Sequence, residues 1–218
     1  MNASEFRKLV TKHFSPKIRE LGWKGSGFSF KKIDDNHIVN LFGIQGSWMG
    51  GSVCCETAIH FDFYPDFEKM TYAGCIIRQR LSPKGEGDYH WNFSNKEERN
   101  IESINSIWTA FEKYGHKFYA DFENFPSPFD KIKPNDLERT DRYKILGKYH
   151  IYNQIELARL LKDINLLIGN MPYAKSFSEY GIIRAEEMAK KMLVGRKTKA
   201  YYQTETFFQR QIDSLKIK

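Results

Sequence analysis

The sequence predicts an α+β fold: an antiparallel sheet of about five strands, covered on one face by two helices and followed by a helical C-terminal extension. Two observations support this prediction. Apolar and polar residues alternate with a period of two in several segments between residues 28 and 93, and apolar residues recur at helical spacing on both sides of that region. The predicted domains are residues 1–130, the α+β domain, and residues 131–218, a basic helical extension.

The N-terminal region predicts one helix and one hairpin. Phe6 and Val10 lie on one helical face, and Pro16 is expected to end that helix. Strands are predicted over residues 28–33 and 37–45, because the Asp-Asp-Asn sequence between them is typical of a turn.

Three further strands are predicted over residues 57–63, 75–81 and 89–93. Their loops are too short for crossover helices, so the strands should be antiparallel, with one apolar and one polar face. A helix over residues 95–124 should then cover the apolar face together with the first helix.

The remaining sequence predicts a connection and three helices. Prolines interrupt residues 124–147, which we interpret as an ordered connection. Apolar spacing predicts a helix over residues 151–168, and Ser176 with Glu179 predicts the start of a second helix that ends at Gly195. The last helix is expected over residues 206–215.

Several motifs in residues 3–135 resemble a bacterial family known only as domain of unknown function 4304. The matching residues are Leu21-Gly22-Trp23, Gly27, Phe30, Asn40, Gln45-Gly46-Ser47, Ile59, Phe61, Phe63, Arg80-Leu81 and Asp88-Tyr89-His90-Trp91. The chain departs from the family pattern at Trp23, at His90-Trp91 and in the glycine-rich segment 43–51. The resemblance implies an α+β fold and no particular chemistry.

Charge is distributed unevenly along the chain. Residues 1–130 contain 16 Lys and Arg against 17 Asp and Glu, whereas residues 131–218 contain 18 against 10. The formal net charge of +7 therefore comes from the C-terminal region, and it predicts contact with an acidic partner rather than a particular fold.

Two groups of residues are candidate sites. The first is the polar sheet face, a candidate ligand-binding site where a guanidinium pair beside a histidine and a carboxylate could bind a phosphate or carboxylate. Its members are His60, Asp62, Arg78, Arg80 and His90. The simpler interpretation is a solvated face on which Asp62 pairs with an arginine from the neighbouring strand.

The second group is a candidate partner-binding site in the C-terminal region. It comprises Lys190, Lys191, Arg196, Lys197, Lys199, Tyr201 and Tyr202, together with Trp48 from the glycine-rich loop. Cations interleaved with aromatic rings suit an acidic protein or a nucleic acid, although lysines at a helix end also offset its dipole. Trp48 could anchor a contact, but we expect it to fold back onto the sheet.

From these patterns we expect a non-enzymatic bacterial binding module that docks an acidic protein partner, such as an immunity- or defence-type factor. The alternatives are a nucleic-acid-binding protein that uses the basic segment, and a small-ligand or phosphate-handling enzyme that uses the polar sheet face. The sequence shows no catalytic motif strong enough to name a reaction and predicts no cofactor and no metal.

Localisation is predicted from the cysteines and the apolar content. Three cysteines, an odd number that includes the adjacent pair Cys54 and Cys55, fit a reducing compartment. No secretory signal and no run of 18 apolar residues is visible, so we expect a cytoplasmic protein that does not enter a membrane.

Overall fold

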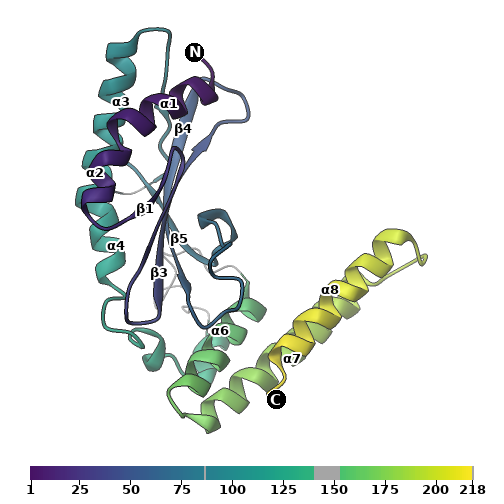
Figure 1. Ribbon diagram of the computed structural model, residues 1–218. Coiled ribbons are helices and arrows are strands. Elements are labelled where there is room, and N and C mark those ends of the chain that lie inside the picture. Colours follow the sequence, from purple (N-terminus) through teal and green to yellow (C-terminus); the bar gives the residue numbers. More distant parts are fainter. Residues whose placement is uncertain (86, 140–152, 218) are drawn as a thin grey trace. The chain divides into compact units, whose positions relative to one another are not determined.

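The computed structural model describes residues 1–85, 87–139 and 153–217 and confirms the α+β fold. The chain divides into two compact units, Met1–Phe125 (unit 1) and Pro126–Lys218 (unit 2), and each is considered by itself (Figure 1).

Unit 1 is built on a six-stranded antiparallel sheet with the order β1-β2-β3-β4-β5, in which β6 pairs with β4. The strands are β1 (Lys24–Ser26), β2 (Ser29–Ile33), β3 (Ile38–Gly46), β4 (Ser52–Phe61), β5 (Ile77–Leu81) and β6 (Trp91–Asn92). The predicted hairpin of residues 28–45 is confirmed, but β4 begins five residues earlier than predicted and ends at Phe61, where the chain turns.

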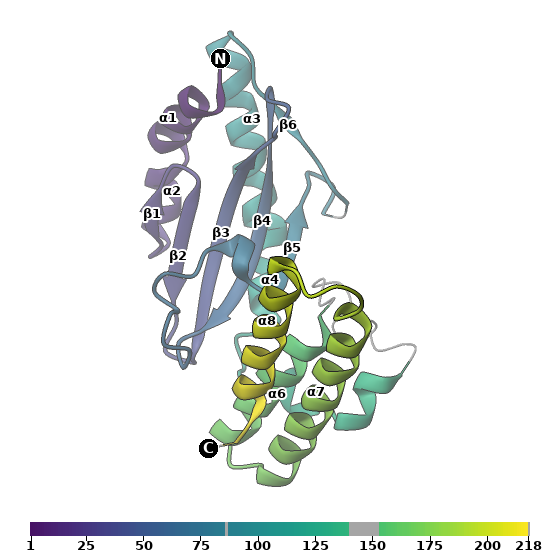
Figure 2. The same ribbon diagram turned by 90° about the vertical axis from the view of Figure 1, so that its right-hand side faces the viewer.

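Helices cover one face of this sheet, as Figures 1 and 2 show. They are α1 (Ala3–His13), α2 (Ser15–Glu20), α3 (Glu97–Ala110), the π-helix η2 (Phe111–Gly115) and α4 (His116–Ala120). Pro16 does not simply end the first helix. It lies in the first turn of α2, where its missing N–H breaks no helical hydrogen bond.

The core between these layers is an aromatic cluster. Phe14 from the junction of α1 and α2 stacks on Phe42 of β3 with ring centroids 5.4 Å apart. The ring centroids of Phe111 and Phe42 lie 5.0 Å apart, and the Trp108 and Phe14 rings pack in a T-shaped arrangement with centroids 5.4 Å apart. Phe14, Phe42 and Phe111 are fully buried, so packing of these rings fixes the helices on the sheet.

The opposite sheet face carries a smaller apolar cluster under the segment that contains the 3-10 helix η1 (Tyr72–Gly74). Phe67, Met70 and Tyr72 pack there against Val39, Leu41, Ala58 and Cys75. A Cβ atom at Gly43 would overlap the Tyr72 ring, so glycine is what lets the ring lie flat against β3.

We therefore expect Gly43→Ala to lower the free energy of unfolding by about 1–3 kcal/mol through overpacking. Chemical denaturation measures this loss. In a Tyr72→Ala background the same substitution should cost much less, because the clashing ring is gone. Equal losses in both backgrounds would contradict this explanation.

Unit 2 is helical. Its elements are η3 (Phe129–Lys131), η4 (Pro134–Glu138), α6 (Gln154–Leu167), α7 (Met171–Met192) and α8 (Lys199–Leu215). The predicted helix start at Ser176 is wrong: α7 begins at Met171 after the N-cap Asn170, and Ser176 lies inside it, bonded to the carbonyl of Pro172. Parts of the predicted connection 124–147 and of the predicted helix 151–168 lie outside the described residues.

Helices α7 and α8 form a hairpin, seen side by side in both ribbon views (Figures 1 and 2). At its base, Ser178 Oγ donates to the carbonyl of Leu215 at 2.8 Å, and Lys162 Nζ of α6 donates to the carbonyl of Ser214 at 2.7 Å. These bonds satisfy carbonyls at the C-terminus of α8. From residue 186 to residue 207, by contrast, every residue is at least partly exposed.

Candidate functional site

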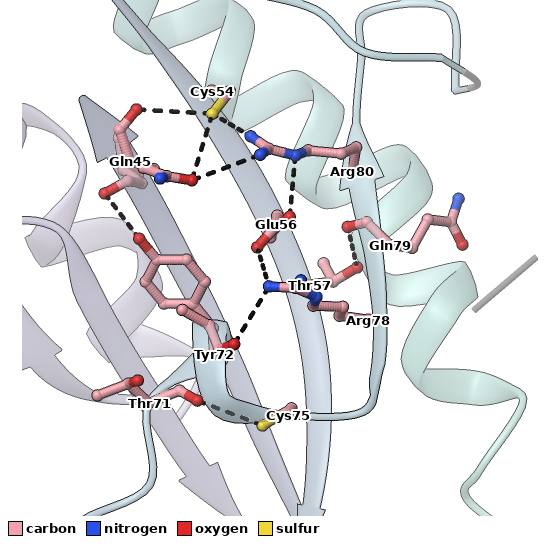
Figure 3. A network of polar contacts seen from close by, with 12 residues as sticks. Gln45, Cys54, Glu56, Thr57, Thr71, Tyr72, Cys75, Arg78, Gln79 and Arg80 are labelled. Atoms are coloured by element: carbon pink, nitrogen blue, oxygen red, sulfur yellow. Dashed lines mark hydrogen bonds and ion pairs between the residues drawn. The ribbon is translucent and has the colours of Figure 1, made fainter. Parts of the chain in front are cut away.

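On the polar sheet face, two arginines converge on one buried carboxylate. The β4–β5 register places Arg80 opposite Glu56 and Arg78 opposite Ala58, so both guanidiniums reach the face that carries Glu56. Arg80 Nε lies 2.9 Å from Glu56 Oε1, and Arg78 Nη1 lies 3.5 Å from Glu56 Oε2 (Figure 3). Glu56 is buried, whereas about a third of each arginine side chain is exposed.

The arginines make further contacts around this pair (Figure 3). Arg80 Nη1 donates to Cys54 Sγ, and Arg80 Nη2 donates to Gln45 Oε1 at 3.4 Å. Arg78 Nη1 donates to the carbonyl of Ala73 at 3.2 Å. Arg80 thus contacts Glu56, Cys54 and Gln45, and Arg78 contacts Glu56 and the backbone of Ala73.

The predicted members of this site separate into three groups. Arg78 and Arg80 meet at Glu56. His90 is joined to Arg80 through Asp88, whose carboxylate oxygens lie 3.7 Å from His90 Nε2 and 4.0 Å from Arg80 Nε.

Asp62 and His60 belong to neither contact. Asp62 pairs with a histidine rather than with an arginine: its Oδ1 lies 2.9 Å from His37 Nδ1. The buried His60 ring stacks on the Tyr64 ring with centroids 5.3 Å apart.

Sequence reasoning missed Glu56, the centre of the cluster. Glu56 has the same parity along β4 as Ala58 and His60, so period-two alternation assigns it to their face. The usable signal was a single acidic residue inside an otherwise apolar run, and it was lost because the strand was predicted to start at residue 57.

The electrostatics favour a fixed ion-pair cluster over a nucleophile. Burial raises the pKa of the Cys54 thiol even though Arg80 opposes this shift. Burial by itself would lower the pKa of Arg80, but the Glu56 carboxylate and its neighbours outweigh it and the pKa is raised. Arg80 is therefore a permanent cation and Cys54 a neutral thiol at neutral pH.

All three cysteines are free and buried, and burial raises each thiol pKa, to about 12 for Cys75. Because the thiolate is the reactive form, we expect slow modification of the native protein by a disulfide reagent at about pH 8, and rapid modification of three thiols after unfolding in urea. Stoichiometric modification of native thiols as fast as in urea would contradict this.

The second predicted site lies at the distal end of the α7–α8 hairpin. Residues 188–204, the basic tip, contain five cations and no carboxylate. Lys190 and Lys191 lie in the last turn of α7, Arg196 and Lys197 lie in the connecting loop, and Lys199 begins α8; all five are exposed. No carboxylate of the described residues forms an ion pair with any of them.

Apolar side chains accompany these cations. Met192 is 57% exposed, Val194 75% and Tyr202 52%.

Trp48, the predicted anchor in unit 1, is 93% exposed at the turn between β3 and β4, so the expectation that it folds back onto the sheet is wrong. Gly50 and Gly51, both with positive φ, shape this turn.

Within residues 1–85, 87–139 and 153–217, no helix is long and apolar enough to span a bilayer. Over the same ranges, no three side chains of His, Cys, Asp or Glu gather closely enough to hold a metal ion.

Comparison with known proteins bears on unit 1. No curated protein and no solved structure matches the chain. A protein-family model, Domain of unknown function (DUF4304), matches residues 14–121, a span that contains all six strands, α2, α3 and α4. The polar sheet face lies inside the match and the basic tip lies outside it. The resemblance in the motifs is thus confirmed, and residues 14–121 of this chain form a DUF4304 domain.

Proposed function

We propose that this protein is a non-enzymatic binding module whose basic tip docks an acidic protein surface. The observation that carries the proposal is the composition of residues 188–204, where five exposed cations occur without a carboxylate. Charges that are not neutralised within the protein leave a positive field that speeds association with a negative partner. Cytoplasmic location and an immunity- or defence-type role belong to the same proposal.

The apolar side chains at the tip favour a protein partner over a nucleic acid. Met188, Met192 and Val194 are exposed beside the lysines, and a phosphate backbone offers them no apolar surface. Methionines adapt to varied apolar partners, and an interface typically combines an apolar centre with a charged rim. We assign the centre to Met192 and Val194 and the rim to the five cations.

Nucleic acid is the second candidate, and one contact favours it. Lys197 Nζ lies 6.0 Å from the centre of the Tyr201 ring, and Tyr202 is exposed next to it. A cation beside an aromatic ring suits a phosphate followed by a stacked base. The enzyme alternative has weaker support, because Glu56 holds both arginines of the polar sheet face.

The test compares two variants of equal net charge. The tip variant replaces Lys190, Lys191, Arg196, Lys197 and Lys199 with Gln. The control variant replaces five exposed lysines elsewhere with Gln: Lys8, Lys24, Lys117, Lys131 and Lys175. The probes are a labelled helical peptide with Glu on one face and Leu on the other, and labelled DNA and RNA oligonucleotides.

At about 50 mM salt we expect the tip variant to bind the peptide about tenfold or more weakly than wild type, and the control variant to stay within about twofold. Binding of wild type should weaken at about 300 mM salt. Equal losses in both variants would overturn the proposal, since net charge alone would then explain binding. Oligonucleotide binding with a steep salt dependence, without peptide binding, would replace it with the nucleic-acid function.

A further inference from the structure

In unit 2, the groove between α7 and α8 is filled by a helix at its base. Three helices meet at Gly181 of α7, where an added Cβ atom would crowd both Leu215 of α8 and Ala158 of α6. Phe177 and Ala185, four residues to either side of Gly181, are fully buried. The base of the groove is therefore a surface that packs against a helix, and its occupant is α6.

Helix α6 is shorter than the hairpin that it packs against. It has 14 residues against 22 in α7, so at about 1.5 Å per residue it is about 12 Å shorter. A short loop at the base joins the two helices, so they are antiparallel and the N-terminal end of α6 points toward the basic tip. Figure 1 shows the hairpin continuing past α6. Its residues 186–207 are all at least partly exposed.

The distal part of the groove keeps an apolar floor. Met188 and Met192 follow Gly181 by 7 and 11 residues, a spacing that places all three on one stripe of α7. On α8, Tyr201 precedes the buried Phe208 by seven residues and so continues the stripe of that ring. Both methionines are exposed and Tyr201 is half-buried. The apolar stripes that pack on α6 at the base thus extend beyond it.

The rim of this distal part is basic. Lys191 lies in the same turn of α7 as the two methionines, and Lys197 Nζ lies 6.0 Å from the centre of the Tyr201 ring. Residues 188–204 contain no carboxylate. A second copy of this chain would bring like charges together in the groove, whereas a helix with Asp or Glu beside its apolar stripe would complement them.

We propose that the distal groove binds an amphipathic helix of the acidic partner, in continuation of α6. The apolar stripe of this helix packs on Met188, Met192 and Tyr201, and its carboxylates pair with Lys191 and Lys197. The occupant is a helix because the same groove already holds one at its base, and methionines adapt to varied apolar side chains. This inference rests on the proposed docking function and specifies the structure of the partner.

Two labelled peptides of identical composition test the inference. The helical probe has Leu at positions i, i+3, i+4 and i+7 and Glu on its other face, whereas the scrambled probe spreads the same Leu residues around the helix. By fluorescence anisotropy we expect wild type to bind the helical probe about tenfold or more tightly. Equal binding of both probes, lost in the tip variant, would overturn the groove and leave the docking function standing. Binding of neither probe would overturn both.

Variants locate the binding. The groove variant, Met188→Ser with Met192→Ser, keeps all five cations of the tip. We expect it to bind the helical probe about tenfold more weakly and the scrambled probe within about twofold of wild type. The control is Met171→Ser with Ile183→Ser, two exposed apolar residues of α7. Met171 is at the base, and Ile183 lies about 200° around the helix from Gly181.

The control variant should keep the wild-type preference for the helical probe, and far-UV circular dichroism checks that both variants retain their helices. A folded groove variant that still prefers the helical probe would refute the site.

Discussion

Replacing Phe111 with alanine is expected to lower the free energy of unfolding of unit 1 by about 3–5 kcal/mol. Phe111 is fully buried, and the centroid of its ring lies 5.6 Å from that of Trp23 and 5.0 Å from that of Phe42. It joins the π-helix to β3, so truncation loses both the transfer free energy of the ring and the contacts around the resulting cavity. Chemical denaturation followed by tryptophan fluorescence measures the loss.

Trp48→Ala is the matched control for this prediction. It also truncates a large aromatic side chain in unit 1, but Trp48 is 93% exposed and its removal should change the free energy of unfolding by at most about 0.5 kcal/mol. Similar losses for Phe111→Ala and Trp48→Ala would show that the aromatic cluster is not the core of the domain.

The second large effect is expected for Glu56→Gln, which should destabilise unit 1 by about 2–3 kcal/mol. Removing one partner of a buried ion pair typically costs about 3–5 kcal/mol, because the other charge remains. Here Arg78 and Arg80 are about a third exposed and keep part of their hydration, which reduces the loss. Gln keeps the volume of the side chain, so the measured change reports the charge.

A double-mutant cycle with Arg80→Met separates this interaction from general damage. We expect a coupling energy of about 1–3 kcal/mol between positions 56 and 80. Asp88→Asn is the control, since Asp88 is 61% exposed and lies 4.0 Å from Arg80 Nε; it should cost at most about 0.5 kcal/mol. Absence of coupling would mean that the cluster of Figure 3 contributes no stability.

Much of the fold follows from local patterns. The turn sequence Asp34-Asp35-Asn36 identifies the hairpin of β2 and β3, because a short polar turn joins two antiparallel strands. Boundaries were less predictable. Ser176 with Glu179 resembles a capping box, yet α7 starts earlier because Asn170 caps it and Pro172 is well tolerated in a first turn.

The candidate site depended on contacts that no local pattern encodes. Period-two alternation places Arg78 and Arg80 on one face but cannot tell which carboxylate of the neighbouring strand lies opposite, and the register selects Glu56 rather than Asp62. The basic tip was easier to find, because its charge is concentrated in one continuous segment.

The most direct test of the proposed function is an amide NMR titration of the whole protein with the acidic helical peptide. Docking at the basic tip predicts that shift changes concentrate in residues 188–204 and disappear in the tip variant while persisting in the control variant. Shift changes spread over exposed lysines of both units, or centred on the polar sheet face, would contradict the account.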